Sequence, residues 1–210
     1  MIDIVAHINN IQREVATGRI GAADATSVLV RRELDAPVDD VWDACTDPAR
    51  IGRWFLPVTG EFTVGGRYQL EGNAGGEILR CDAPRLLRVT WAFGDMPPSE
   101  VEIRLAPAGD DSTLFELEHV GIVDPAMWAR FGPGAVGVGW DLTALGLYLH
   151  LTDPAALKPD AWQRTPEYRE FATGSAAAWG AAHEKFGATP DEAAAAASNT
   201  TAFYTTIPAE

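Results

Sequence analysis

Residues 35–57, DAPVDDVWDACTDPARIGRWFLP, decide the fold because they contain two helix starts in immediate succession. Pro37 opens the first helix, where its missing N–H costs nothing, and the aspartates that follow it suit the positive end of the helix dipole. Apolar residues then recur at a spacing of three and four, which predicts one buried face. Asp47 caps a second, shorter helix, and Pro48 occupies its first turn. The segment predicts two small helices that end at a pair of aromatic rings.

The segments on either side of these helices have strand patterns. Residues 26–34, TSVLVRREL, alternate apolar and polar side chains and predict a strand. No helix start falls between residues 58 and 120, and turns rich in glycine, proline and aspartate divide this part of the chain. Short, consecutive, alternating strands predict an antiparallel sheet with one apolar and one solvated face. Four such segments are residues 65–72, 86–93, 101–107 and 113–120.

A long apolar helix is predicted after the strands. From Val136 to Leu151 the sequence is apolar almost all round, relieved mainly by Asp141 and Thr143, so this helix is expected to lie across the sheet in the core. Glycines inside a helix cost up to about 1 kcal/mol each relative to alanine. Close approach of the helix backbone to the sheet, room for a ligand, or both would compensate for them. These glycines are Gly137, Gly139 and Gly146.

The last part of the chain has a different character. Thr165-Pro166 and Thr189-Pro190 start two further helices, the first of them amphipathic. We therefore divide the chain into an N-terminal segment (residues 1–25), a main domain (26–151) and a helical C-terminal extension (152–210). The extension is expected to pack on the main domain or on a second subunit, in which case it would form a homodimer contact.

Composition excludes several classes of partner. The chain has 210 residues, 47% hydrophobic content and a net charge of −14, which argues against nucleic acid or an anionic membrane as a partner. It has neither a signal-peptide pattern nor an apolar run long enough to span a membrane. Two cysteines and four scattered histidines give no disulfide framework and no metal-ligand spacing. We expect a cytoplasmic protein without a metal or cofactor.

Several short sequence motifs occur in an order that is typical of one protein family. Residues 35–57 are followed by Gly65-Gly66 before a strand, by Asp82-Ala83-Pro84 before LLRVTW, by STLFELEHVG, and by Gly139-Trp140 in the long helix. Over residues 26–151 this ordered set closely resembles the bacterial branch of the family named for the activator of heat-shock-protein-90 ATPase, within the SRPBCC superfamily. The resemblance implies the α+β helix-grip (START-like) fold. In that fold a curved antiparallel sheet wraps around a long C-terminal helix, with two short helices after the first strand. A cavity lies between sheet and helix, and this chain adds the helical extension.

Aromatic side chains are the main candidates for a site in that cavity. They lie on the inferred inward faces of the strands and helices, where they would shape a pocket for a small hydrophobic or aromatic ligand. The alternative, that they only seal an ordinary core, has equal weight. The candidate ligand-binding residues are Trp54, Phe55, Tyr68, Trp91, Phe115, His119 and Trp140.

The sequence leaves other functions open. His119 shares the apolar strand face and could serve a cyclase- or hydrolase-type enzyme as an acid–base group, although such a histidine is more often held by a polar neighbour. The direction of Arg80 is undecided, and an inward Arg80 would suit an anionic ligand group. Gly132 to Gly137 match a dinucleotide pattern without the required strand–turn–helix context, so we reject that reading. No convincing catalytic set emerges, and a co-chaperone-like or protein-interaction role through the extension is a further alternative.

Overall fold

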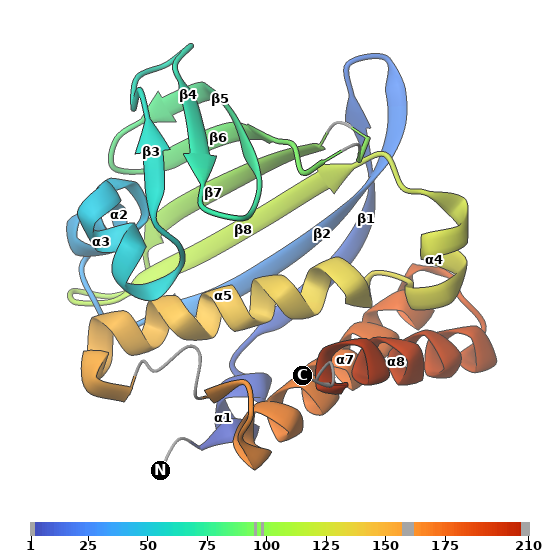
Figure 1. Ribbon diagram of the computed structural model, residues 1–210. Coiled ribbons are helices and arrows are strands. Elements are labelled where there is room, and N and C mark those ends of the chain that lie inside the picture. Colours follow the sequence, from blue (N-terminus) through green and yellow to red (C-terminus); the bar gives the residue numbers. More distant parts are fainter. Residues whose placement is uncertain (1–2, 95, 98, 157–161, 207–210) are drawn as a thin grey trace.

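The structure is a computed structural model that describes residues 3–94, 96–97, 99–156 and 162–206. Its described strands form one antiparallel sheet with the spatial order β1-β2-β8-β7-β6-β5-β4-β3. Figure 1 shows this sheet curving over α5, which lies across its apolar face. The strands are β1 (Gln12–Ile20), β2 (Ala23–Leu34), β3 (Val58–Gly60), β4 (Arg67–Leu70), β5 (Gly75–Asp82), β6 (Leu86–Trp91), β7 (Ser99–Pro107) and β8 (Thr113–Gly121).

Helices cover one face and one end of the sheet, which confirms the helix-grip α+β fold. The two small helices α2 and α3 close the end near β3, and the remaining helices lie beside or beneath α5 (Figure 1). They are α1 (Ile4–Asn9), α2 (Val38–Thr46), α3 (Pro48–Trp54), α4 (Pro125–Phe131), α5 (Gly134–Thr152), the 3₁₀ turn η1 (Pro154–Ala156), α7 (Pro166–Phe186) and α8 (Pro190–Thr205).

The helix starts predicted at Pro37, Asp47-Pro48, Thr165-Pro166 and Thr189-Pro190 correspond to the beginnings of α2, α3, α7 and α8. The side chains of Asp47 and Asp124 accept hydrogen bonds from the first turns of α3 and α4, as capping aspartates should. Thr189 and Glu192 form a capping box at the start of α8. Local capping interactions are therefore sufficient to locate these helix starts without reference to tertiary contacts.

The N-terminal part of the chain differs from the expectation. The sequence predicts no helix or strand in residues 1–25, but the structure places α1, the edge strand β1 and the first residues of β2 there. The two small helices therefore follow the second strand of the chain instead of the first. The sequence does not predict β1 because Arg13 occupies one of its inward positions, opposite Val30 of β2. A buried charge interrupts the alternation by which half-buried strands are recognised.

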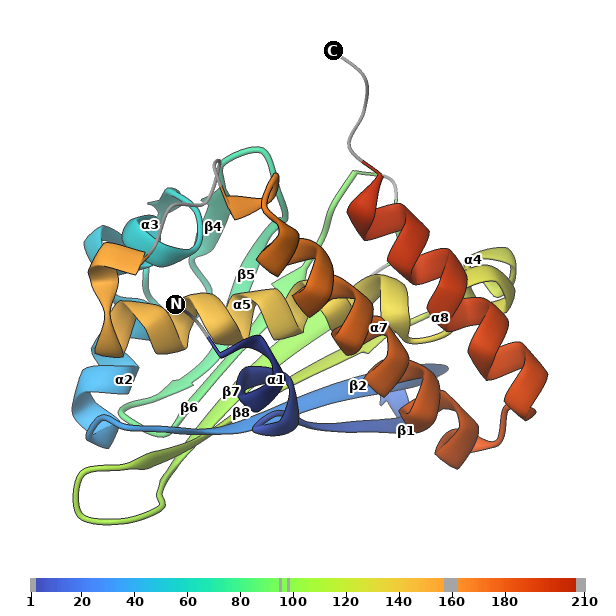
Figure 2. The ribbon, with the colours of Figure 1, turned by 90° about the horizontal axis from the view of Figure 1, so that it is seen from below.

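The C-terminal extension packs against the main domain of the same chain. Figure 2 shows α7 and α8 side by side beneath α5, joined at Gly187, whose φ of 120° favours glycine. A Cβ atom on Gly137 would overlap the indole ring of Trp179 in α7, and one on Gly134 would meet Thr200 in α8. The glycines at the start of α5 thus allow the C-terminal extension to approach the helix closely. The sequence suggested that they allow the sheet to do so.

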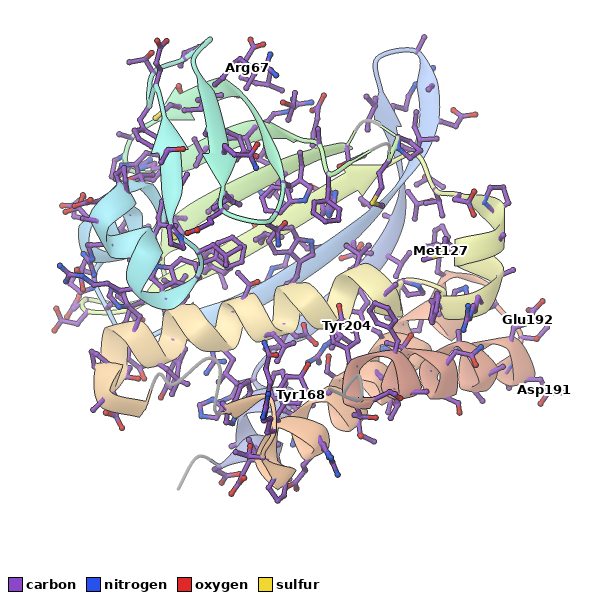
Figure 3. The ribbon with its side chains drawn as sticks, viewed as in Figure 1. Arg67, Met127, Tyr168, Asp191, Glu192 and Tyr204 are labelled. Carbon is purple, nitrogen blue, oxygen red and sulfur yellow. The ribbon has the colours of Figure 1, made fainter. Side chains whose placement is uncertain are left out.

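Hydrogen bonds reinforce this contact between α5 and the extension. One carboxylate oxygen of Asp141, which is fully buried, accepts bonds from Nε of Arg13 (2.7 Å), Oγ of Ser175 and Nε1 of Trp179 (3.1 Å). Tyr204, labelled in Figure 3 between α8 and α5, donates its hydroxyl to the carbonyl of residue 135 at 2.7 Å. The back of α5 is therefore held by β1, α7 and α8 together.

Candidate functional site

An apolar cavity of about 160 Å³ lies between the sheet, α3 and the front of α5. Its wall is built from residues of β3 to β8, from the loop between β3 and β4, from the end of α2, from α3 and the loop after it, and from α5. None of the lining side chains is charged. They are Cys45, Thr46, Ile51, Trp54, Phe55, Val58, Phe62, Tyr68, Leu70, Ile78, Cys81, Leu87, Val89, Trp91, Val101, Ile103, Phe115, Leu117, Trp140 and Thr143.

Six of the seven predicted ligand-binding residues lie on this wall. Trp54 and Phe55, at the end of α3, stack with ring centroids 5.7 Å apart. The indole N–H of Trp54 donates to the carbonyl of Ala44 in α2 at 3.0 Å, which fixes the two small helices to each other. The aromatic end of the opening segment therefore forms one wall of the cavity. The other four are Tyr68, Trp91, Phe115 and Trp140.

Two tryptophans and a histidine form a further part of the site. The rings of Trp91 and Trp140 meet in a T-shaped arrangement at 5.0 Å, and His119 lies 5.6 Å from Trp140 and 6.3 Å from Trp91. Such edge-to-face contacts hold aromatic rings in fixed orientations. These three rings form an aromatic cluster at the edge of the cavity.

His119 lies behind the cavity wall and does not line the cavity. Its Nδ1 atom is 3.0 Å from Nε1 of Trp140, which can only donate, so Nδ1 must accept and the imidazole proton resides on Nε2. Burial lowers the pKa of His119 to about 4, and the ring is therefore neutral at pH 7. Among the described residues no carboxylate hydrogen-bonds to it. This arrangement is that of a histidine satisfied by a polar neighbour.

Arg80 points away from the cavity. A bulge between Ile78 and Arg80 shifts the register of β5, which turns Arg80 outward and brings Cys81 to the inward side. The Arg80 side chain is 59% exposed and pairs with Asp82. Both cysteines line the cavity: Cys45 is buried, whereas Cys81 is exposed at its rim.

Sequence reasoning missed several wall residues, and for many of them a signal was present. Leu70 shares the inward face of β4 with Tyr68, and Leu87 and Val89 share that of β6 with Trp91. Strand alternation places them beside the predicted residues. Phe62 has no such signal, because it lies in the loop between β3 and β4.

The described part of the chain contains no group of three or more histidine, cysteine or acidic side chains arranged to hold a metal ion. Within the same residues, every helix is too short or too polar to cross a bilayer.

Comparison with known proteins identifies relatives over the same region. The sequence profile of one family, described as Activator of Hsp90 ATPase homolog 1-like protein, matches residues 35–151. The crystal structure of CalU16 from Micromonospora echinospora is 38% identical, with a TM-score of 0.66, over 83% of this chain and 98% of CalU16. Its solution NMR structure is 36% identical, with a TM-score of 0.71, over 83% of this chain and 96% of CalU16. The CalU16 match is longer than residues 1–151, so it includes part of the C-terminal helices.

Two other solved structures are more distant. DynU16, described as a protein in the dynemicin biosynthetic locus, is 25% identical over 60% of this chain and 47% of its own, with a TM-score of 0.53. MLL2253 from Mesorhizobium loti is 25% identical over 60% of this chain and 98% of its own, with a TM-score of 0.52. No curated protein matches the chain.

Proposed function

Because the chain belongs to the family of Activator of Hsp90 ATPase homolog 1-like proteins, we propose that it binds a small, uncharged, largely apolar molecule between the sheet and α5. The observation that carries the proposal is the wall of the cavity, which is rich in aromatic rings and contains no charged side chain. Ligand binding to such a wall is favourable because it removes apolar ligand surface from water. A charged ligand would lose its hydration there without a counter-ion.

The volume of the cavity limits the size of the ligand. An engineered protein cavity of roughly 150 Å³ is known to admit benzene, and the space here is about 160 Å³. A compound of one or two fused rings therefore suits the cavity as it stands. A larger ligand would have to extend past the rim, where Phe62 is 44% exposed.

One relative supports a small-molecule role, because DynU16 is described as a protein in the dynemicin biosynthetic locus. Binding is favoured over catalysis because the lone pair of Nδ1 of His119, the acid–base candidate predicted from the sequence, is occupied by Trp140. A role in stimulating an ATPase would rest on the family description alone, so we do not propose it.

Two-dimensional ¹H–¹⁵N NMR of the full chain tests the proposal through the indole N–H signals. Titration with a panel of one- and two-ring aromatic compounds should shift the signals of Trp54, Trp91 and Trp140, which line the cavity. The signal of Trp128 should stay in place, because its ring packs against His183 on the far side of α5. Binding should also raise the unfolding midpoint with increasing ligand concentration.

A variant that fills the cavity provides the matched control. Ile103→Trp places a large ring in the cavity and should abolish the shifts. Val5→Trp adds the same ring at an exposed position and should leave them unchanged. The proposal fails if no compound of the panel shifts the cavity signals, or if Ile103→Trp binds as well as the natural chain.

A further inference from the structure

Almost all polar hydrogens of the side chains on the cavity wall already form hydrogen bonds within the protein. The indole N–H of Trp54 and the hydroxyl of Tyr68 donate to the backbone carbonyls of Ala44 and Thr90, at 3.0 and 2.7 Å. The indole N–H of Trp140 donates to His119. The wall threonines, Thr46 and Thr143, donate to carbonyls one helical turn earlier, at 2.8 and 2.9 Å. None of these hydrogens is available to a ligand unless an internal bond breaks.

Trp91 is the exception. Its ring lines the cavity and is half-buried, and within the described part of the chain its indole N–H has no hydrogen-bond acceptor. The rings of Trp91 and Trp140 pack edge to face, with their centroids 5.0 Å apart. An indole N–H can only donate, and it usually finds a partner when it is taken out of water. Apart from the weak thiol donors of Cys45 and Cys81, it is the one unengaged side-chain donor on the described cavity wall.

We infer that Trp91 determines the specificity of the cavity by donating its indole N–H to an acceptor oxygen of the ligand. This inference rests on the proposed function and narrows the ligand to a compact aromatic molecule that carries a carbonyl or similar uncharged acceptor. A carboxylate would also accept the proton, but the uncharged wall offers it no cation. A ketone, aldehyde or quinone oxygen meets both conditions.

The physical basis is the cost of an unpaired polar group. A pure hydrocarbon that covers Trp91 would displace water from the N–H and leave it without an acceptor, which is unfavourable. A ketone of the same skeleton restores a hydrogen bond at that point. The ketone restores a hydrogen bond that the hydrocarbon leaves unmade, so it should bind about tenfold more tightly, which corresponds to about 1.4 kcal/mol.

A matched pair of compounds tests the inference. Indane and 1-indanone share one bicyclic skeleton and differ by the replacement of a CH₂ group by C=O. Isothermal titration calorimetry of the full chain should give a dissociation constant for 1-indanone about tenfold lower than that for indane. Trp91→Phe should remove this preference while indane still binds.

Two further proteins separate the N–H group from the shape of the ring. Replacement of the Trp91 indole by benzothiophene keeps the bicyclic ring and removes the N–H, so it should abolish the preference even if Trp91→Phe does not fold. Trp128→Phe makes the same replacement of an indole by a phenyl ring outside the cavity, where Trp128 packs against His183. The preference for the ketone should survive in Trp128→Phe.

The outcomes distinguish this inference from the proposed function. If neither compound binds and the wider panel also fails, ligand binding in the cavity is refuted and the role of Trp91 falls with it. If both compounds bind with equal affinity, or if the benzothiophene protein keeps the preference, the cavity binds ligands but Trp91 does not select them. Loss of the preference in the Trp91 proteins alone is the supporting result.

Discussion

Gly137 in α5 lies directly against the indole ring of Trp179 in α7, with no room for a Cβ atom between them. Four residues later on the same helix, Asp141 accepts a hydrogen bond from that indole. The front of α5 contributes Trp140 and Thr143 to the cavity. The extension therefore holds the helix that forms one wall of the site.

Gly137→Ala should destabilise the protein by about 2–3 kcal/mol, because the added methyl group forces Trp179 or α5 to move. Urea unfolding measures the change. Gly52→Ala is the control: its nearest neighbour would be 3.7 Å away, so the higher helix propensity of alanine should leave stability unchanged or raise it by up to about 1 kcal/mol. Equal effects of the two substitutions would contradict the close contact.

Asp141→Asn should lower the free energy of unfolding by about 3–5 kcal/mol, because it leaves the buried guanidinium of Arg13 without its carboxylate. Ser175→Ala removes only one of the three donors and should cost about 1 kcal/mol. Both values come from denaturant titrations. If Asp141→Asn lowered the free energy of unfolding no more than Ser175→Ala does, the buried charge of Arg13 would not depend on Asp141 as its counter-ion.

His119 should make the fold sensitive to acid. Its pKa is lowered by burial to about 4 in the folded protein, against 6.5 in the unfolded chain, so protonation favours unfolding. Stability linked to this group is complete above pH 6.5, declines as the pH falls to about 4 and then levels off. The total loss is at most about 3 kcal/mol.

His119→Asn isolates this contribution, since the amide oxygen can still accept from Trp140 but does not titrate. Other histidines and the carboxylates titrate in both proteins and cancel in the comparison. The stability of the variant should therefore improve relative to the natural chain between pH 6.5 and 4. Parallel stability curves across this range would show that His119 does not titrate as described.

The two thiols should differ in reactivity. Burial raises the pKa of Cys45 to about 12, so it should resist a disulfide reagent until the protein unfolds, whereas the exposed Cys81 should react at once. Absorbance at the end of the fast phase should correspond to one thiol, and Cys81→Ser should abolish that phase. Two fast thiols would show that Cys45 is accessible. Because Cys81 lies at the rim of the cavity, a bound ligand should slow its reaction.

Local patterns in the sequence were sufficient to predict the inward faces of the strands and the starts of the helices. Alternation along the strands predicted which side chains face inward, and this placed Tyr68, Trp91 and Phe115 together on the apolar face of the sheet. Capping aspartates and threonines followed by proline marked the helix starts. Both signals depend on a few neighbouring residues, so they can be read without the path of the chain.

The tertiary structure alone decided which distant groups meet. Arg13 and Asp141 are 128 positions apart, and nothing near either residue indicates the other. The same holds for Trp140 and His119, whose rings are joined by a hydrogen bond, and for Gly137 with Trp179. These contacts form between residues that are far apart in the sequence and meet only in the folded chain. The role of a buried charge or of a glycine in a helix therefore cannot be predicted until its partner in the structure is known.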